Sequence, residues 1–258
     1  MKLTIENKSK LEMFVALFQL LKNWSAHINL QFKEDHLYIQ GMDKSHVALA
    51  NICIQSKWFA TYAISNEHIN SAAVDSTHFA IMLNYALKHN RMELVLDNDD
   101  KLNINFINNK EIKETFDHFF EIPLMDIEED ALVIPDIEYD VDFSISAKKV
   151  TDLITELSVF GTELHVKCSE EVLEFNSSGD LGKLKVNIPI DDLNEYAISE
   201  DEKIEIYYSL NHVGKMCMST KLGTEICISI SHDYPMNIKY NLGDDSFVSF
   251  YIAPKIKD

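Results

Sequence analysis

Asp43, Ser45 and His46 stand almost side by side in the sequence, and they are the side-chain types of a hydrolytic catalytic triad. The members of a triad converge from separate elements of a fold, however, and no glycine-rich segment that could form an oxyanion hole accompanies these three. A hydrolase that uses them is therefore a minor alternative, and we expect no catalytic residue in this chain.

Asp97, Asp99 and Asp100 resemble the start of a calcium-binding loop. Such a loop requires Gly at its sixth position and Glu at its twelfth, where this chain has Leu102 and Asn108. The four cysteines are widely spaced and include no CxxC pair, so we expect small buried side chains in place of metal ligands or disulfides. We predict neither a metal nor a cofactor.

The chain has 258 residues, which is enough for one large domain or two of ordinary size. Its formal charge is -19 and Arg91 is its only arginine, which disfavours sequence-specific reading of DNA. Seven glycines leave little from which to build a phosphate-binding loop. No apolar run has the length of a membrane helix, and the first residues do not resemble a secretory signal, so we expect a soluble, intracellular protein.

Apolar and polar residues alternate along most of the chain, which is typical of antiparallel strands with one buried face. Helical spacing of apolar residues interrupts this pattern in four segments, namely 8–23, 76–90, 146–159 and 209–220. These segments are neutral or basic, while the rest of the chain is acidic. We therefore expect helices that present a neutral-to-basic surface on an acidic body.

The helical segments fall two in each half of the chain, which suggests an internal repeat. An ungapped shift of 136 residues superposes the apolar positions of 14–21 on those of 150–157 and the strand pair 28–39 on 164–175. Two domains of similar topology are therefore predicted, at 1–120 and 137–258. Between them, residues 121–136 combine prolines with a run of acids and read as a surface connector whose apolar residues need a partner.

Four sequence motifs resemble the proliferating cell nuclear antigen (PCNA) family, the eukaryotic-type DNA sliding clamps. They are Met42-Asp-Lys-Ser-His-Val-Ala-Leu49, Leu132-Val-Ile-Pro135, Ser177-Ser-Gly-Asp-Leu-Gly182 and Tyr251-Ile-Ala-Pro-Lys-Ile256. The resemblance covers the whole chain and implies an α+β DNA clamp fold, with two topologically similar domains per chain. It also implies that three chains associate head to tail into a closed ring of six domains.

The resemblance implies three functional surfaces. Edge strands near 113–120 and 182–187 would join neighbouring subunits, with Phe116, Phe120, Leu184 and Val186 as interface candidates. The DNA-facing candidates are Lys8, Lys10, Lys22, Lys88, Arg91, Lys148, Lys149, Lys215 and Lys221. The candidates for a hydrophobic groove that binds partner peptides are Met42, His46, Val47, Leu49, Ile127, Leu132, Ile134, Tyr234, Pro235, Tyr251, Ile252, Ala253 and Pro254.

The expected function is therefore that of a non-enzymatic homotrimer that encircles duplex DNA without regard to sequence. It would act as a polymerase processivity factor and dock a clamp loader and other replication and repair proteins, in the nucleus or at a viral replication site, with the cytoplasm as a further option and with no membrane partner. The third helical segment departs from the family in carrying Asp152 and Glu156 along its middle. The alternative is a monomeric clamp-fold processivity factor that binds DNA by one basic face.

Overall fold

The computed structural model describes residues 1–64, 70–97, 100–108, 116–127 and 132–255. The chain divides into two compact units. Unit 1 comprises Met1–Lys44, Ala50–Leu132 and Leu242–Val248, and unit 2 comprises Ser45–Leu49, Val133–Asn241 and Ser249–Asp258. Each unit is described by itself.

The elements of the first half of the chain begin with a strand, a long helix and a run of strands. In chain order they are β1 (Lys2–Ile5), α1 (Lys8–Leu21), β2 (His27–Phe32), β3 (His36–Met42), β4 (Ala48–Gln55), η1 (Ser56–Trp58), β5 (Thr61–Ala63), β6 (Ser71–Asp75), α2 (Ser76–Leu83), η2 (Asn84–Lys88), β7 (Arg91–Val95), β8 (Lys101–Ile107) and β9 (His118–Pro123). The short η elements are 3-10 helices.

The second half repeats this order. Its elements are β10 (Val141–Ser146), α3 (Ala147–Leu157), β11 (Glu163–Cys168), β12 (Leu173–Gly179), β13 (Gly182–Ile188), η3 (Ile190–Asp192), β14 (Glu195–Ile198), β15 (Ile204–Ser209), α4 (Leu210–Cys217), β16 (Glu225–Ile230), β17 (Met236–Gly243) and β18 (Ser246–Ile252). β10 therefore corresponds to β1, α3 to α1, and so on to β18, which corresponds to β9.

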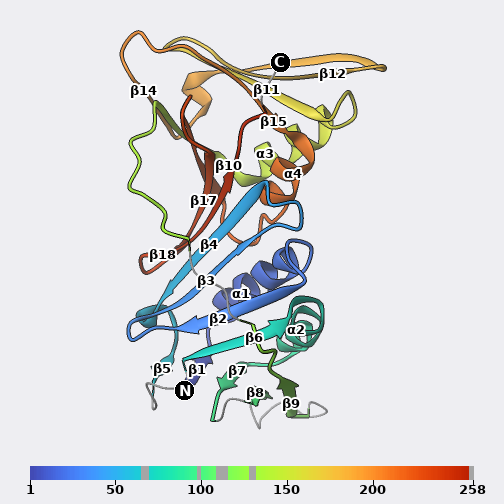
Figure 1. Cartoon of the computed structure of the whole chain (residues 1–258), viewed down its shortest axis with the longest axis vertical. Coiled ribbons are helices and arrows are strands. Elements are labelled where there is room, and N and C mark those ends of the chain that lie inside the picture. Colours follow the sequence, from blue (N-terminus) through green and yellow to red (C-terminus); the bar gives the residue numbers. More distant parts are fainter. Residues whose placement is uncertain (65–69, 98–99, 109–115, 128–131, 256–258) are drawn as a thin grey trace. The chain divides into compact units, whose positions relative to one another are not determined.

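Strand pairing confirms the predicted repeat. In unit 1 the strands lie in the orders β5-β1-β7-β8-β9 and β4-β3-β2-β6, and in unit 2 in the orders β14-β10-β16-β17-β18 and β13-β12-β11-β15 (Figure 1). The pairings for which a register is given are antiparallel, for example β2 with β3 and β11 with β12. Each half is thus α+β, with the same topology, as the sequence predicted.

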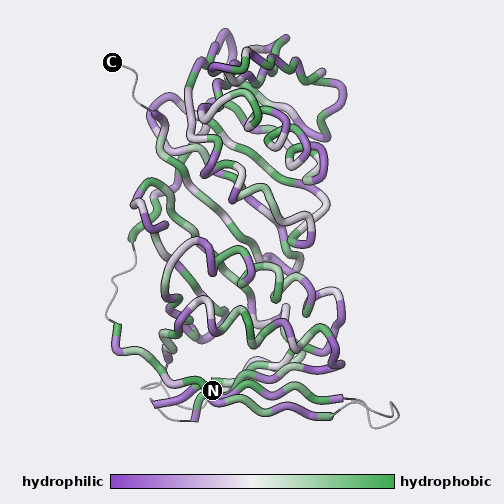
Figure 2. The backbone as a smooth tube through the Cα atoms, turned by 90° about the vertical axis from the view of Figure 1, so that its right-hand side faces the viewer, coloured by the Kyte–Doolittle hydropathy of each residue, from purple (hydrophilic) through white to green (hydrophobic). Residues whose placement is uncertain are grey.

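The apolar stripe of α1 explains how a helix packs on these sheets. Leu11, Phe14, Phe18 and Leu21 are buried at spacings of three and four residues. The helix starts at Asn7, whose side chain accepts from Lys10 N–H at 3.1 Å. Along the strands the spacing changes to two, and the alternation of hydrophobic and hydrophilic positions is visible in Figure 2. The core therefore lies between the helices and the buried faces of the strands.

The helices end earlier than predicted. α1 stops at Leu21, and the predicted helix 76–90 is two elements, because α2 tightens into the 3-10 helix η2. α3 and α4 stop at Leu157 and Cys217. After α1 the chain continues in tighter turns, in which Asn23 N–H donates to Leu20 O at 3.1 Å and Trp24 N–H to Leu21 O at 2.8 Å, so helical spacing continues in the sequence beyond the helix itself.

The cysteines only partly follow the prediction. Cys168 and Cys217 are buried, and burial raises the pKa of each thiol to about 12. Cys53 is half-buried and Cys227 is exposed on β16, because its side chain falls on the solvent face of that strand, so the expectation of burial was wrong for Cys227. Among the residues described here, no helix combines the length and apolar character that a membrane span requires.

Candidate functional site

Helices α1 and α2 of unit 1 pack side by side, joined by an aromatic contact and an amide bridge. The ring of Phe18 meets that of Phe79 edge-on at 4.8 Å. At the outer side, Gln19 Nε2 donates to Ala80 O at 2.7 Å and to Asn84 Oδ1 at 2.9 Å. The two helices therefore present one continuous surface, the helix face of unit 1.

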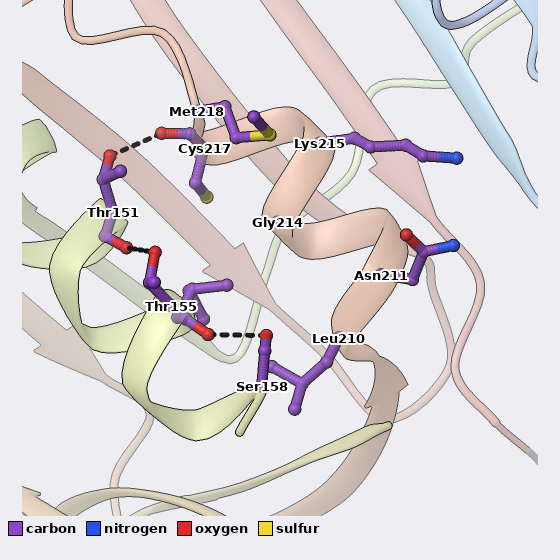
Figure 3. Close-up of a pocket in the computed structure, with 10 residues that line it drawn as sticks. Thr151, Thr155, Ser158, Leu210, Asn211, Gly214, Lys215, Cys217 and Met218 are labelled. Carbon is purple, nitrogen blue, oxygen red and sulfur yellow. Dashed lines mark hydrogen bonds between the residues drawn. The ribbon is translucent and has the colours of Figure 1, made fainter. Parts of the chain in front are cut away.

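Helices α3 and α4 form the corresponding helix face of unit 2, and a shallow pocket of about 260 Å³ lies between them (Figure 3). Gly214 faces Ile154 across this gap, where a Cβ would lie at an ordinary contact distance of 3.6 Å. Thr151 Oγ1 donates across the gap to Cys217 O at 2.7 Å.

Most of the side-chain hydroxyl groups that line this pocket already donate hydrogen bonds to backbone carbonyl groups. Thr155 and Ser158 donate to carbonyl oxygens of the preceding turn, at 2.7 Å each. Asn211 and Lys215 extend from α4 on the side away from these hydroxyl groups (Figure 3). Only these two residues of the lining have donors that could meet an anion such as a DNA phosphate.

The predicted DNA-facing residues divide into two groups. Lys88, Lys149 and Lys221 are exposed, and Lys215 is half-buried at the pocket. Lys8 donates to Leu87 O, and Lys22 donates to Gln19 Oε1 at 2.6 Å, so both lie along the helix face of unit 1 with local partners. Lys148 pairs with Asp152 one turn later, at 2.6 Å. All seven lie on or next to the helices.

The second group consists of Lys10 and Arg91, which are held within the structure. Lys10 Nζ donates to Trp58 O at 2.8 Å and to Asp244 Oδ2 at 2.7 Å, and lies 5.2 Å from the Trp58 ring. Arg91 pairs with Glu93 and, at 3.4 Å, with Glu6. These contacts neutralise both cations and make them poor partners for DNA.

Strands β9 and β13 each end a sheet in the described part of the chain. Phe116, just before β9, is 77% exposed, and Phe119 is 71% exposed. Phe120, Leu184 and Val186 are half-buried. Residues 113–115 of the first predicted edge lie outside the described residues. The sequence analysis missed Phe119. Its spacing of three residues from the buried Ile122 places its side chain on the opposite side of the strand, which was a usable signal.

The C-terminal segment and the 45–49 segment lie together in unit 2. Ala253 N–H donates to Val47 O at 3.3 Å. Tyr139 Oη donates to Pro235 O at 3.3 Å, and burial, helped by the nearby phenol of Tyr251, raises the pKa of Tyr139 to about 12.

The groove candidates of unit 2 differ in how far they are exposed to solvent. His46, Val47, Tyr234 and Ala253 are exposed, and Leu49, Ile134, Pro235, Tyr251 and Pro254 are half-buried. Ile252 is 0% exposed, so its inclusion in the groove lining is corrected: alternation along β18 turns this side chain into the core, where it supports the surface from beneath.

In unit 1 the connector is held by an amide that the sequence analysis missed. Gln40, on β3, donates from Nε2 to Leu132 O at 2.9 Å and accepts at Oε1 from Leu132 N–H at 2.6 Å. Earlier in the connector, Met125 N–H donates to Ala73 O at 2.8 Å. Met42 and Ile127 are half-buried and Leu132 is exposed. Glutamine at a solvent-side strand position carries no sequence signal for such a role.

The geometry around Ser45 and His46 does not support the hydrolase alternative. Ser45 Oγ lies 3.0 Å from Nε2 of His212, and Nδ1 of His212 lies 2.8 Å from Ser209 Oγ. Ser45 thus contacts a histidine on α4, and the third member of the chain is a serine where a triad needs a carboxylate. His46 has a positive φ of 55°, which places it in a tight turn of an exposed loop. In the calcium-like segment, Asn98 and Asp99 lie outside the described residues.

Comparison with known proteins gives a consistent result over the whole chain. The family model described as proliferating cell nuclear antigen, N-terminal domain, matches residues 5–131, and the model of the C-terminal domain matches residues 133–255. The chain is similar to proliferating cell nuclear antigen 1 of Plasmodium falciparum, with 28% identity over 260 residues, 94% of this chain and 93% of that protein. It is also similar to proliferating cell nuclear antigen of Chaetomium thermophilum, with 25% identity over 246 residues, 92% of each chain.

A solved structure shows the same fold. The crystal structure of a PCNA2-PCNA3 complex from Sulfolobus tokodaii matches with a TM-score of 0.86 over 99% of each chain, at 21% sequence identity.

Proposed function

This chain belongs to the proliferating cell nuclear antigen family and is a DNA sliding clamp that acts as a polymerase processivity factor, and from that premise we propose how its surfaces divide the work. Clamp domains at 1–120 and 137–258, joined by the connector 121–136, form a homotrimeric ring. The helix faces line its channel, the edge strands β9 and β13 join its subunits, and the connector and C-terminal segment receive partner peptides.

The observation that carries the ring is the internal repeat. Within unit 1, β4 lies beside the Ser246–Val248 part of β18. In the repeat, β4 corresponds to β13 and β18 corresponds to β9, so β9 and β13 are the counterparts of two strands that already pair. Both are edge strands in the described residues. A second copy supplies the partner that each edge lacks, and a contact between two different surfaces repeats head to tail until the ring closes.

The helix faces suit a surface along which DNA slides. A ring retains DNA by enclosing it, so its contacts with phosphate need only be weak, exposed and exchangeable. Lys88, Lys149, Lys215 and Lys221 meet this description, because their side chains are exposed or half-buried and stand on or beside α2, α3 and α4. We therefore narrow the DNA-facing set and assign Lys10 and Arg91 to structural ion pairs.

The connector and C-terminal segment suit short peptides with hydrophobic anchors. Exposed Val47, Leu132 and Tyr234 are apolar groups that an acidic surface does not otherwise need. Burying each large anchor of a partner contributes about 1.5 to 3 kcal/mol, and the costs of association offset much of the total, so two or three anchors give weak binding. Exchangeable binding of this kind fits a platform shared by a polymerase, a clamp loader and repair proteins.

Proteins of this family are clamps without enzymatic activity, and their relatives are replication proteins. We extend both statements to this chain, as a non-enzymatic clamp of the nucleus or of a viral replication site. No observation favours the monomeric alternative.

Retention on DNA with blocked ends tests the ring. The protein is first allowed to thread onto linear biotinylated DNA with open ends at low salt, the ends are closed with streptavidin, and the salt concentration is then raised. We expect retention only on the blocked DNA, because phosphate contacts are screened whereas enclosure is not. Light scattering should give three times the 29.6 kDa chain mass.

Phe119→Glu provides the matched variant, since it places a charge on the exposed side of β9 without disturbing the core. It should lower the mass to that of one chain and abolish retention on blocked DNA. Met218→Glu alters an equally exposed apolar side chain, next to α4, and should leave the mass unchanged. A wild-type protein that is monomeric at micromolar concentration, or that washes off blocked and open DNA alike, would contradict the proposal.

A further inference from the structure

His89 is a buried histidine that none of the assigned surfaces uses. It follows η2, its residue is 3% exposed, and its ring packs 5.5 Å from that of Phe106. Nδ1 lies 2.6 Å from Tyr85 O, and Nε2 lies 3.0 Å from Phe116 O. A carbonyl oxygen only accepts hydrogen bonds, so both ring nitrogens point at acceptors.

A second histidine meets the same ring. Nε2 of His89 is 2.9 Å from Nδ1 of His118, the first residue of β9, and the two rings are perpendicular. The His118 ring in turn lies parallel to Phe120 and 5.9 Å from Tyr85. The pair therefore fastens the start of the edge strand β9 to the end of η2.

Among the described residues, the polar and charged neighbours of this pair come from three elements, and only Asp117 and Lys88 are charged. On the β9 side, Asp117 is exposed, and its carboxylate accepts from Asn108 N–H at 2.8 Å. From the end of β8, Asn108 Nδ2 donates to Phe116 O at 3.0 Å. On the η2 side, Lys88 is exposed and Tyr85 offers its carbonyl and ring. The aromatic and amide groups in direct contact with the two imidazoles are uncharged.

The contact between the two imidazoles holds a single proton. Either His89 Nε2–H donates to His118 Nδ1, or His118 Nδ1–H donates to His89 Nε2, depending on the tautomers of the two rings. The pair can be neutral or carry one positive charge in this geometry. If both rings are protonated, two N–H groups face each other at 2.9 Å with no lone pair between them, and like charges repel.

We propose that His89 positions the leading end of β9 for pairing with a second copy of this chain. Double protonation of His89 and His118 would release this end of β9 from His89 and so weaken the pairing. The inference rests on the proposed ring and names a regulation of its subunit contact. Phe116, whose carbonyl His89 engages and whose ring is exposed, lies at that end of the strand.

The sign of the pH dependence follows from the proton count. The assembled contact binds at most one proton where two separated histidines bind two, so acidification favours separation. One extra proton at each subunit contact changes the equilibrium constant of that contact by at most about tenfold per pH unit. Net charge acts in the opposite direction, because a chain with a charge of -19 and a pI of about 4.8 repels its copies less as the pH falls.

Sedimentation equilibrium of the full chain at pH 8, 7, 6 and 5.5, at constant ionic strength, tests the inference. We expect the wild-type association constant, expressed per subunit contact, to fall by up to about tenfold per pH unit as the pH is lowered from 8 to 5.5. His118→Phe keeps an aromatic ring beside Phe120 but removes the second proton, so the fall should disappear. His78→Phe removes an exposed histidine of α2 and should behave like the wild type.

Wild-type association that is constant or rises toward pH 5.5, or a fall that persists in His118→Phe, would overturn the inference and leave the ring intact. A chain that is already monomeric at pH 8 would instead contradict the ring. In that case the imidazole ¹⁵N resonances of His89 and His118 test only the contact between the two rings. Two coupled titration steps support this contact, and two independent histidine titrations reject it.

Discussion

At the residue scale, cations with the same charge perform different work. Lys8 and Lys10 are two residues apart at the start of α1, yet Lys10 bridges Trp58 O and Asp244 within unit 1 while Lys8 reaches Leu87 O. Arg91, the single arginine, is paired with Glu93 and Glu6. Charge pattern alone groups all of these as a basic face, and only their partners tell structural ion pairs from groups that DNA can engage.

Glu93 lies at the centre of one such pair. Burial alone would raise the pKa of its carboxyl group, but hydrogen bonding to Lys2, the charges of Arg91 and Lys2, and the hydrogen bond from Arg91 outweigh burial and hold the pKa below its ordinary value. A lowered native pKa stabilises the fold above the pKa of the unfolded chain, and this stabilisation is lost as the pH falls through the native value.

Glu93→Gln should therefore lower the free energy of unfolding at pH 7, and the difference from the wild type should shrink as the pH falls below ~4.5. Urea denaturation at pH 7, 5, 4 and 3.5 measures it. Glu121→Gln, at an exposed pair with Lys101, is the control and should change stability little at any pH. A difference for Glu93→Gln that is the same at pH 7 and 3.5 would show that the charge pair is not its source.

At the element scale, strands at corresponding positions of the repeat have different neighbours. β9 and β18 are counterparts in the repeat, but β18 is covered on both sides by β17 and β4, whereas β9 has only β8 in the described residues. The connector is likewise fixed by an element distant in sequence, because Gln40 on β3 holds both backbone groups of Leu132.

Gln40→Met keeps the size of the side chain and removes both hydrogen bonds to the connector. Each such bond contributes about 0.5–1.5 kcal/mol net, and the two together about 1–3 kcal/mol. We therefore expect a fluorescent peptide with hydrophobic and aromatic anchors to bind about five- to hundredfold more weakly, with trimer mass unchanged. Gln31→Met, at a half-buried position on the adjacent strand β2, is the control. Equal peptide affinities for both variants would mean that the clamped connector does not form the binding surface.

At the scale of the whole molecule, a net charge of -19 is compatible with a DNA-binding function because retention comes from enclosure. Attraction to phosphate then controls how DNA is met and how the protein slides, and enclosure controls how long it stays. The two contributions can be separated by salt, since screening weakens only the first.

Lys149→Gln should reduce the salt dependence of binding to open-ended DNA. The slope of the logarithm of the association constant against that of the salt concentration should fall by about 0.9 for each phosphate contact that a subunit loses. Retention on end-blocked DNA should stay at the wild-type level. Arg91→Gln, which removes a cation already paired with Glu93, should leave the slope unchanged. Fluorescence anisotropy over a salt series gives the slope, and identical slopes for the wild type and Lys149→Gln would remove Lys149 from the DNA-facing surface.

The sequence by itself determined the elements, the repeat and the family. Periodicity of two or of three to four residues is imposed by the geometry of strands and helices, so the buried stripe of α1 and the match between β2–β3 and β11–β12 can be read from residue spacing. The motifs Met42–Leu49 and Tyr251–Ile256 carried the resemblance that the family models bear out.

Only the tertiary structure decided which of these residues are available. Ile252 and Tyr234 look alike as apolar groove candidates, but the pleat of β18 buries the first and a loop exposes the second. The roles of three residues depend on partners distant in sequence. The partners of Lys10 are 48 or more residues away, that of Gln40 is 92 residues away, and that of His89 is 29 residues away. Hydrogen bonds and ion pairs act over a few ångströms in space, and distance along the chain does not record which polar groups folding brings that close.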